Sequence, residues 1–128
     1  MQLLLDTHTF LWWLIGDASL STPARKAIAS ERNGVFISAA TAWEIATKLR
    51  LGKLPSGSSV TDDLESVIES QGFAKLPITI AHGQAAGALP GPHKDPFDRM
   101  LIAQAMLESL VLVSNEEAFS AYGVRRLW

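Results

Sequence analysis

Four acidic residues stand where a folded chain can hold a carboxylate rigidly, either just after a short apolar run or near the start of a predicted helix. They are Asp6, Glu44, Asp98 and Glu116. Two unit charges about 4 Å apart repel by about 4 kcal/mol at an effective dielectric of about 20, so four converging carboxylates need a positive charge among them. Carboxylate oxygens suit hard divalent cations. The pattern therefore indicates a site for Mg²⁺, or for Mn²⁺, provided that the fold brings the acids together.

Asp6 and Glu44 each have a simple structural alternative. Asp6 could cap the helix that is expected to follow it. Glu44 is flanked by the apolar residues Trp43 and Ile45. It could nevertheless be an exposed side chain that pairs with Lys48, four residues later on the same helix. Because four acids occur at comparable positions, we interpret Glu44 as a site residue.

The segment Asp95-Pro96-Phe97-Asp98 has the strongest structural alternative. An aspartate before proline is a good N-cap, with the proline at the first helical position. Asp98 then stands where the acid of a capping box would stand, with Arg99 as a ready surface partner. One of the two aspartates is therefore expected to be structural. The helix that follows is too apolar to be exposed, so its first turn would be a rigid mount for a ligand.

Zinc and nucleophile chemistry are poorly supported. The chain has no cysteine, which removes thiolate ligands and disulfides. Its histidines, His8, His82 and His93, share no metal-ligand spacing. Each is expected to be structural or solvent-facing, with His8 a minor candidate for contact with substrate.

The acids are positioned by alternating short strands and helices. Strands are predicted at Gln2–Leu5, Val35–Ile37, Phe73–Ile78, Leu110–Val113 and Val124–Leu127. Helices are predicted at 8–15, Ala24–Glu31, Ala39–Leu51, Thr61–Gln71, Ile80–Leu89, Phe97–Glu108 and Glu116–Tyr122, with loops at Pro55–Ser59 and Pro90–Pro96. This alternation predicts one α/β domain over residues 1–128, a three-layer α/β/α sandwich with a central, mainly parallel sheet. Ligands of such sheets bind beyond the carboxyl ends of the strands, where Asp6 and Glu116 fall.

Composition narrows the functional class. Hydrophobic residues make up 48% of 128 residues and charged residues 19%, which is typical of a folded domain. The net charge of −2 argues against a protein that coats nucleic acid, but an enzyme can grip a few phosphates through metal ions. No targeting segment and no run long enough to cross a membrane is apparent, so a cytoplasmic protein is expected.

Four segments together resemble the PIN-domain ribonucleases, in particular the VapC-type toxins of bacterial toxin–antitoxin pairs. They are Leu4-Leu5-Asp6-Thr7-His8, the run from Ser38 to Ile45, the run from Asp95 to Ala105, and the close of the chain from Ala121 to Trp128. The resemblance covers essentially the whole chain in the right order. It implies an α/β/α fold, Mg²⁺ or Mn²⁺ held by acids, hydrolysis of RNA phosphodiesters, and a cognate VapB-like antitoxin.

The resemblance also implies roles for individual residues. Asp6, Glu44 and Asp98 match the metal-binding acids, while Asp95, Thr7 and Ser114 match positions beside the site, in a second shell or near substrate. Glu116 stands where the family usually has aspartate. The extra methylene puts this fourth metal ligand in question, but not the other three.

Partners and rival functions complete the expectations. A homodimer is expected, and the antitoxin is expected to present a basic side chain to the acids and to cover Trp12, Trp13 and the segment Leu11–Ile15, although both tryptophans could equally belong to the core. One rival is an inactive PIN domain that binds RNA or antitoxin. The other is a phosphoryl-receiver domain, which would want paired acids after the first strand and a late lysine; this chain offers a lone Asp6 and no lysine after Lys94.

Overall fold

Five short strands, all parallel, form the centre of the protein. The computed structural model describes residues 1–54 and 63–128. The strand order is β3-β2-β1-β4-β5, and every neighbouring pair is parallel. The strands are β1 (Gln2–Leu5), β2 (Gly34–Ser38), β3 (Ala74–Leu76), β4 (Val111–Val113) and β5 (Arg126–Leu127). The predicted parallel sheet is thus confirmed.

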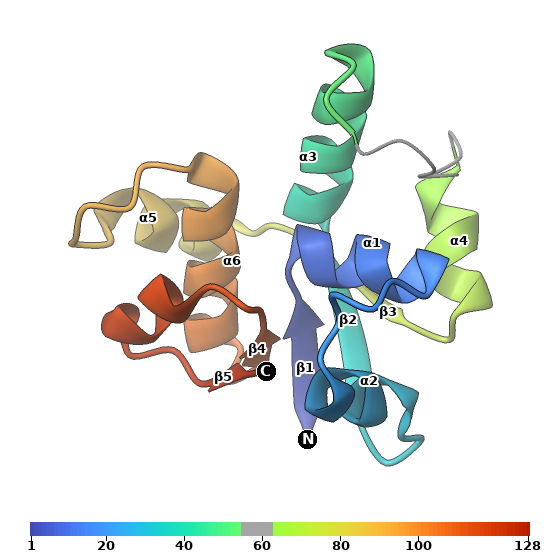
Figure 1. Ribbon diagram of the computed structural model, residues 1–128. Coiled ribbons are helices and arrows are strands. Elements are labelled where there is room, and N and C mark those ends of the chain that lie inside the picture. The colour runs from blue at the N-terminus through green and yellow to red at the C-terminus, as the bar shows by residue number, and fades with distance from the viewer. Residues whose placement is uncertain (55–62) are drawn as a thin grey trace.

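Helices cover both faces of this sheet, as Figure 1 shows. They are α1 (Thr7–Ile15), α2 (Thr22–Ala29), α3 (Ala39–Arg50), α4 (Leu64–Ser70), α5 (Ile80–Ala88), α6 (Pro96–Leu107) and the 3-10 helix η1 (Glu117–Tyr122). Alternate residues of a strand point to opposite faces. Leu3 and Leu5 accordingly pack with α1, α2 and α4, whereas Leu4 packs with α6 and η1. The predicted three-layer α/β/α sandwich is confirmed.

The predicted element boundaries needed local correction. The second helix begins at Thr22, because the Ser21 hydroxyl accepts a hydrogen bond from Ala24 N and so caps it, and it ends at Ala29, because the backbone of Ser30 is extended. The last strand is only Arg126–Leu127, since it pairs with Leu112 and Val113 at the end of the three-residue β4. The third strand is also shorter than predicted.

The α4 helix begins at Leu64, with Asp63 as its N-cap. The predicted start at Thr61 and the predicted loop at Pro55–Ser59 lie outside the described residues.

β1 lies at the centre of the sheet, and the strands that follow it are added first on one side of it and then on the other. From β1 the chain builds outward to β2 and β3 on one side, and later to β4 and β5 on the other. Such a switch point is where open α/β sheets bind ligands, in the crevice beyond the carboxyl ends of the strands. Asp6 immediately follows β1 and Ser114 immediately follows β4, so both lie at this edge.

No helix among residues 1–54 and 63–128 is long and apolar enough to cross a membrane.

Candidate active site

Asp6 is anchored at the junction of the two central strands. It is 4% exposed and caps α1 by accepting a hydrogen bond on Oδ1 from Thr9 N at 2.9 Å. Its own backbone N–H donates to the carbonyl of Val113 in β4 at 3.2 Å, and the Thr9 hydroxyl donates to the same carbonyl at 3.0 Å. The capping alternative for Asp6 is therefore correct, but it uses one carboxylate oxygen. The described chain supplies no hydrogen-bond donor to Oδ2.

Glu44 combines features of both interpretations that the sequence left open. It is only 4% exposed, so it is not a surface residue. The Thr7 hydroxyl donates to Oε1 at 2.6 Å, and Lys48 Nζ contacts Oε2 at 2.5 Å. The Ser38 hydroxyl caps α3 by accepting from Ala40 N at 2.9 Å, which fixes where Glu44 falls. Thr7 thus connects the end of β1 to the acid on α3.

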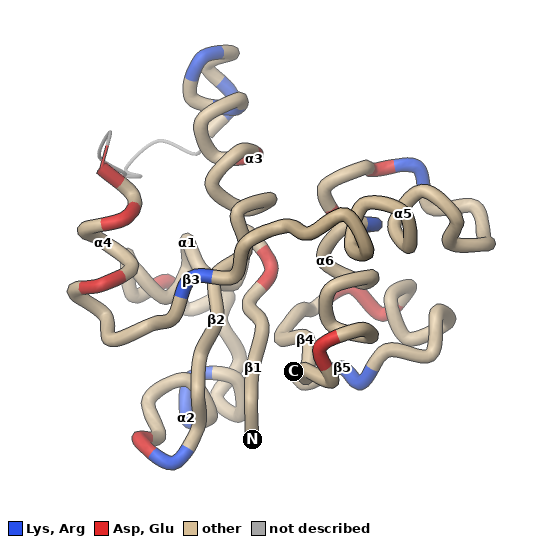
Figure 2. The backbone as a smooth tube through the Cα atoms, turned by 180° about the vertical axis from the view of Figure 1, so that it is seen from behind, with Lys and Arg blue, Asp and Glu red and all other residues tan. Residues whose placement is uncertain are grey.

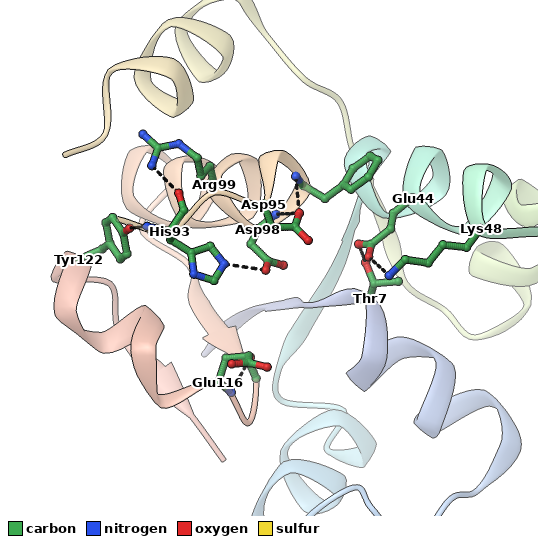
Figure 3. Close-up of polar contacts among 11 residues, drawn as sticks. Thr7, Glu44, Lys48, His93, Asp95, Asp98, Arg99, Glu116 and Tyr122 are labelled. Atoms are coloured by element: carbon green, nitrogen blue, oxygen red, sulfur yellow. Dashed lines mark hydrogen bonds and ion pairs between the residues drawn. The ribbon is translucent and has the colours of Figure 1, made fainter. Parts of the chain in front are cut away.

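Asp95 is the structural aspartate of its pair. It is exposed, and its Oδ1 accepts hydrogen bonds from the backbone N–H groups of Phe97 at 2.9 Å and Asp98 at 3.2 Å. The capping-box interpretation of Asp98 is wrong, because its carboxylate turns away from the cap. Asp98 Oδ2 instead lies 2.8 Å from His93 Nε2. Figure 3 shows the two aspartates directed to different partners.

The pKa of the Asp98 carboxyl is raised to about 6. Burial is the main cause, and the charges of Asp95 and Glu44 add to it, while the hydrogen bond and charge of His93 act in the opposite direction. The effect of Glu44 is informative, since Glu44 is on α3 and Asp98 on α6. The two proposed ligands therefore share one electrostatic environment, although they are far apart in sequence.

Arg99 and His93 behave differently from the expectations. The Arg99 guanidinium is no partner of Asp98: it donates to the carbonyls of Ala86 at 3.2 Å, His93 at 2.9 Å and Leu89. It thereby ties the end of α5 to the following loop. His93 is partly buried rather than solvent-facing, with its side chain 24% exposed and its ring Nε2 2.8 Å from Asp98 Oδ2. Spacing gave no sign of this contact; the position of His93 two residues before an N-cap was the available signal.

The fourth acid occupies a less constrained position. Glu116 is exposed and precedes η1 without capping it through its side chain. Its backbone N–H donates to the hydroxyl of the fully buried Ser114 at 3.1 Å, and the Ser114 carbonyl accepts from Arg126 Nη1 at 2.9 Å. Ser114 thus shapes the turn after β4. Glu116 follows β4 at the carboxyl end of the sheet, on a different element from Asp6, Glu44 and Asp98 (Figure 3).

The donor set suits a hard divalent cation, although the side chains are not arranged as a finished metal centre. Within residues 1–54 and 63–128, no three His, Asp or Glu side chains form a group that could hold a metal ion. Glu44 is instead paired with Lys48, and Asp98 with His93. Even so, Asp6 follows β1, Glu44 lies on α3 after β2, and Asp98 lies in the first turn of α6, and burial has raised the pKa of Asp98. Oxygen donors with excess negative charge are what Mg²⁺ and Mn²⁺ require.

The sequence matches the PIN domain family over residues 3–124, and the chain belongs to this family. No curated protein matches it significantly. Among solved structures, VapBC2 from Rickettsia felis bound to a DNA fragment from its promoter aligns with a TM-score of 0.72 at 15% identity, over 100% of this chain and 99% of that one. FitAB bound to the IR36 DNA fragment aligns with a TM-score of 0.63 at 19% identity, over 98% and 93%. FitAcB from Neisseria gonorrhoeae gives the same score and identity, over 98% and 96%. These similarities establish the fold.

Proposed function

We propose that this chain is a metal-dependent endoribonuclease and the toxin of a toxin–antitoxin pair of the VapC type. The observation that supports the proposal most is that Asp6 directly follows β1 at the switch point of the sheet, while Glu44 on α3 and Asp98 on α6 are close enough for the charge of Glu44 to add a small part to the pKa of Asp98, which burial raises. The similarity to toxin–antitoxin complexes at full length adds the biological setting.

The residues have separate tasks in this proposal. Asp6, Glu44 and Asp98 would hold Mg²⁺, or Mn²⁺, and Glu116 would complete the site more loosely because it is exposed. Thr7 orients Glu44 through its 2.6 Å hydrogen bond. When bound, the cation supplies Lewis acidity for attack of water on a phosphodiester. No side chain needs to act as a nucleophile, which agrees with a chain that has no cysteine.

RNA would be held by few basic residues. Figure 2 shows lysine and arginine gathered at the far end of α3, where Arg50 and Lys53 are exposed. Cations are also favoured at a helix C-terminus by its dipole, which was the preferred explanation from sequence. Lys48 forms an ion pair with Glu44, so in this arrangement its ammonium group is not available to bind phosphate. The substrate grip is therefore assigned mainly to the metal site.

Expression of the chain alone, with mapping of RNA ends, tests the activity. We expect discrete new 5′ ends in RNA from cells that make the chain. We expect none above background with Asp6→Ala, because this variant lacks a proposed metal ligand that the backbone of β4 and the start of α1 hold in place. The same pair should be compared in vitro with Mg²⁺ and with EDTA. Equal cleavage by Asp6→Ala would refute the assignment. Absence of cleavage by the unmodified chain, with retained RNA binding, would favour an inactive PIN domain instead.

A small VapB-like antitoxin is the expected partner, with a basic side chain that pairs with the carboxylates in place of the metal. Trp12 and Trp13 are half-buried against the core, and Trp13 Nε1 donates to Gln71 at 2.9 Å, so neither is fully withdrawn from the surface. Leu11, however, is buried and cannot contribute. A complex of this chain with its antitoxin should bind Mn²⁺ much more weakly than the chain alone. A partner that leaves Mn²⁺ affinity unchanged would rule out this charge replacement.

The proposal also includes a homodimer. Trp43 and Ile78 are exposed beside a groove of about 210 Å³ that α3, α5 and α6 line, and Ile80 nearby is 90% exposed. Apolar side chains of this size are rarely left in water together unless a partner covers them. Light scattering of the purified chain measures this directly, and a monomeric mass at micromolar concentration would contradict it.

A further inference from the structure

The Asp98 carboxylate makes a contact that helix capping does not explain. Asp95 already caps α6, so Asp98 is free of that task. Its Oδ2 lies 2.8 Å from His93 Nε2, and the two side chains are 24% and 25% exposed. A hydrogen bond from an imidazole N–H to a carboxylate fixes which way the carboxylate faces. The described chain supplies no donor to the other oxygen, Oδ1, which leaves it for another ligand.

Both the backbone and the ring of His93 are held in place. Its backbone N–H donates to the Tyr122 hydroxyl at 3.0 Å, and its carbonyl accepts from Arg99 Nη1 at 2.9 Å. The ring meets the fully buried Phe119 edge to face, with centroids 5.4 Å apart. Tyr122 and Phe119 both belong to η1, which follows β4. The imidazole is therefore fixed between α6 and η1 before any ligand arrives.

The loop that carries His93 is shaped for this close approach. Gly91 has a φ of +99°, a conformation that side chains rarely adopt, and a Cβ there would lie 2.9 Å from the Tyr122 hydroxyl. Glycine is thus required where the loop passes over the tyrosine. The same hydroxyl then accepts the His93 N–H. The loop, the tyrosine and the histidine form one rigid unit.

We propose that His93 is a positioning residue, which orients the Asp98 carboxylate toward a divalent cation, with η1 as its support. This inference rests on the proposed function, because it assumes that Asp98 holds the ion. Partners that orient a metal ligand through its outer atoms are a general feature of metal sites, and their loss typically weakens metal affinity by about 10–100-fold. His93 acts through Asp98 and does not itself need to touch substrate.

The test is Mn²⁺ affinity of the purified full chain, measured by the loss of the free-ion paramagnetic resonance signal. We expect His93→Ala to weaken Mn²⁺ binding by about 10–100-fold. His93→Gln should recover most of the affinity, because its side-chain amide can donate from nearly the position of the imidazole Nε2. In cleavage assays, the loss in His93→Ala should shrink as Mn²⁺ is raised.

Two further variants separate positioning from general support of the fold. Tyr122→Phe keeps the aromatic ring but removes the acceptor for the His93 N–H, so it should give a smaller loss than His93→Ala. Lys94→Ala, at the exposed neighbouring position, should bind Mn²⁺ like the unmodified chain. Wild-type Mn²⁺ affinity in a folded His93→Ala chain would overturn the inference alone, as would failure of His93→Gln to recover binding. An unmodified chain that binds no Mn²⁺ would overturn the proposed function itself.

Discussion

Replacing Asp98 with asparagine is expected to reduce RNA cleavage by at least about 100-fold while leaving the metal-free chain as stable as before, or more stable. The reason is the raised pKa of this carboxyl, about 6, which burial causes first and the charges of Asp95 and Glu44 reinforce. Ionised Asp98 therefore costs folding free energy, by less than about 3 kcal/mol because the partly exposed carboxyl is screened by solvent, and the hydrogen bond to His93 is already included in this figure. Asparagine carries no charge and avoids this cost.

The stability difference between Asp98→Asn and the unmodified chain should change with pH in a definite direction. Because the folded-state pKa is raised from 3.8 to about 6, the folded chain binds the Asp98 proton more tightly than the unfolded chain does. The cost of the carboxylate is absent below about pH 4, grows between pH 4 and 6, and is complete above pH 6. In urea unfolding with EDTA, the free energy of unfolding of Asp98→Asn should therefore increase relative to that of the unmodified chain as the pH rises from about 4 to 6. A loss of several kcal/mol at pH 7.5 would instead make Asp98 a structural residue.

Asp95→Ala is the matched control, one turn away on the same helix. Asp95 accepts the N–H groups of Phe97 and Asp98, so its loss should cost about 0.5–2 kcal/mol of stability. Its effect on cleavage should be much smaller than that of Asp98→Asn. The two neighbouring aspartates should therefore show opposite patterns.

Replacing Lys48 with methionine is expected to make the stability of the chain depend more strongly on divalent cations than that of the unmodified chain. Glu44 is 4% exposed and has two partners, Thr7 and Lys48. Without the lysine, the buried carboxylate keeps only the threonine hydroxyl, which should cost about 1–3 kcal/mol. Bound Mg²⁺ would supply the missing positive charge, and ligand at about 100 times its dissociation constant adds about 2.7 kcal/mol. Urea unfolding with Mg²⁺ and with EDTA measures both effects.

The double variant Glu44→Gln with Lys48→Met is the control for this pair. It removes the buried charge together with its partner, so the stability cost and the response to Mg²⁺ should both shrink. Glu44→Gln alone should lose cleavage by at least about 100-fold. If Lys48→Met unfolds in EDTA like the unmodified chain, the lysine contributes nothing to the buried glutamate, and this account of the metal-free site is wrong.

The fold could be predicted because it depends on local patterns. The run Leu3-Leu4-Leu5 is apolar at every position, which is typical of a strand buried on both faces, and the structure places these residues in both core clusters. The position of Asp6 at the carboxyl edge followed from the same run. The N-cap role of Asp95 could be predicted because it precedes a proline, but whether Asp98 completed a capping box could not be decided from the sequence.

The contacts of the site could not be predicted because they depend on loop geometry and side-chain direction. The His93–Asp98 hydrogen bond requires the loop to cross Tyr122, which is 29 residues further along the chain from His93. The sequence suggested that Arg99 pairs with its neighbour Asp98. Its guanidinium instead donates hydrogen bonds to three carbonyls at the end of α5 and in the loop that follows. For Glu44, burial and pairing with Lys48 seemed to be alternatives, and the chain achieves both.

The central position of β1 has a consequence for the order in which the protein is made. Leu3 pairs with Val35 in β2, but also with Val111 in β4, which is synthesised much later. At about 5–20 residues per second, roughly 4–15 s pass between the synthesis of Val35 and that of Val111. During that interval β1 has an unpaired edge, and Leu4 lacks the apolar side chains of α6 that will cover it. Asp98 and Glu116 also emerge long after Asp6 and Glu44, so the proposed site would be incomplete on a growing chain until both have left the ribosome.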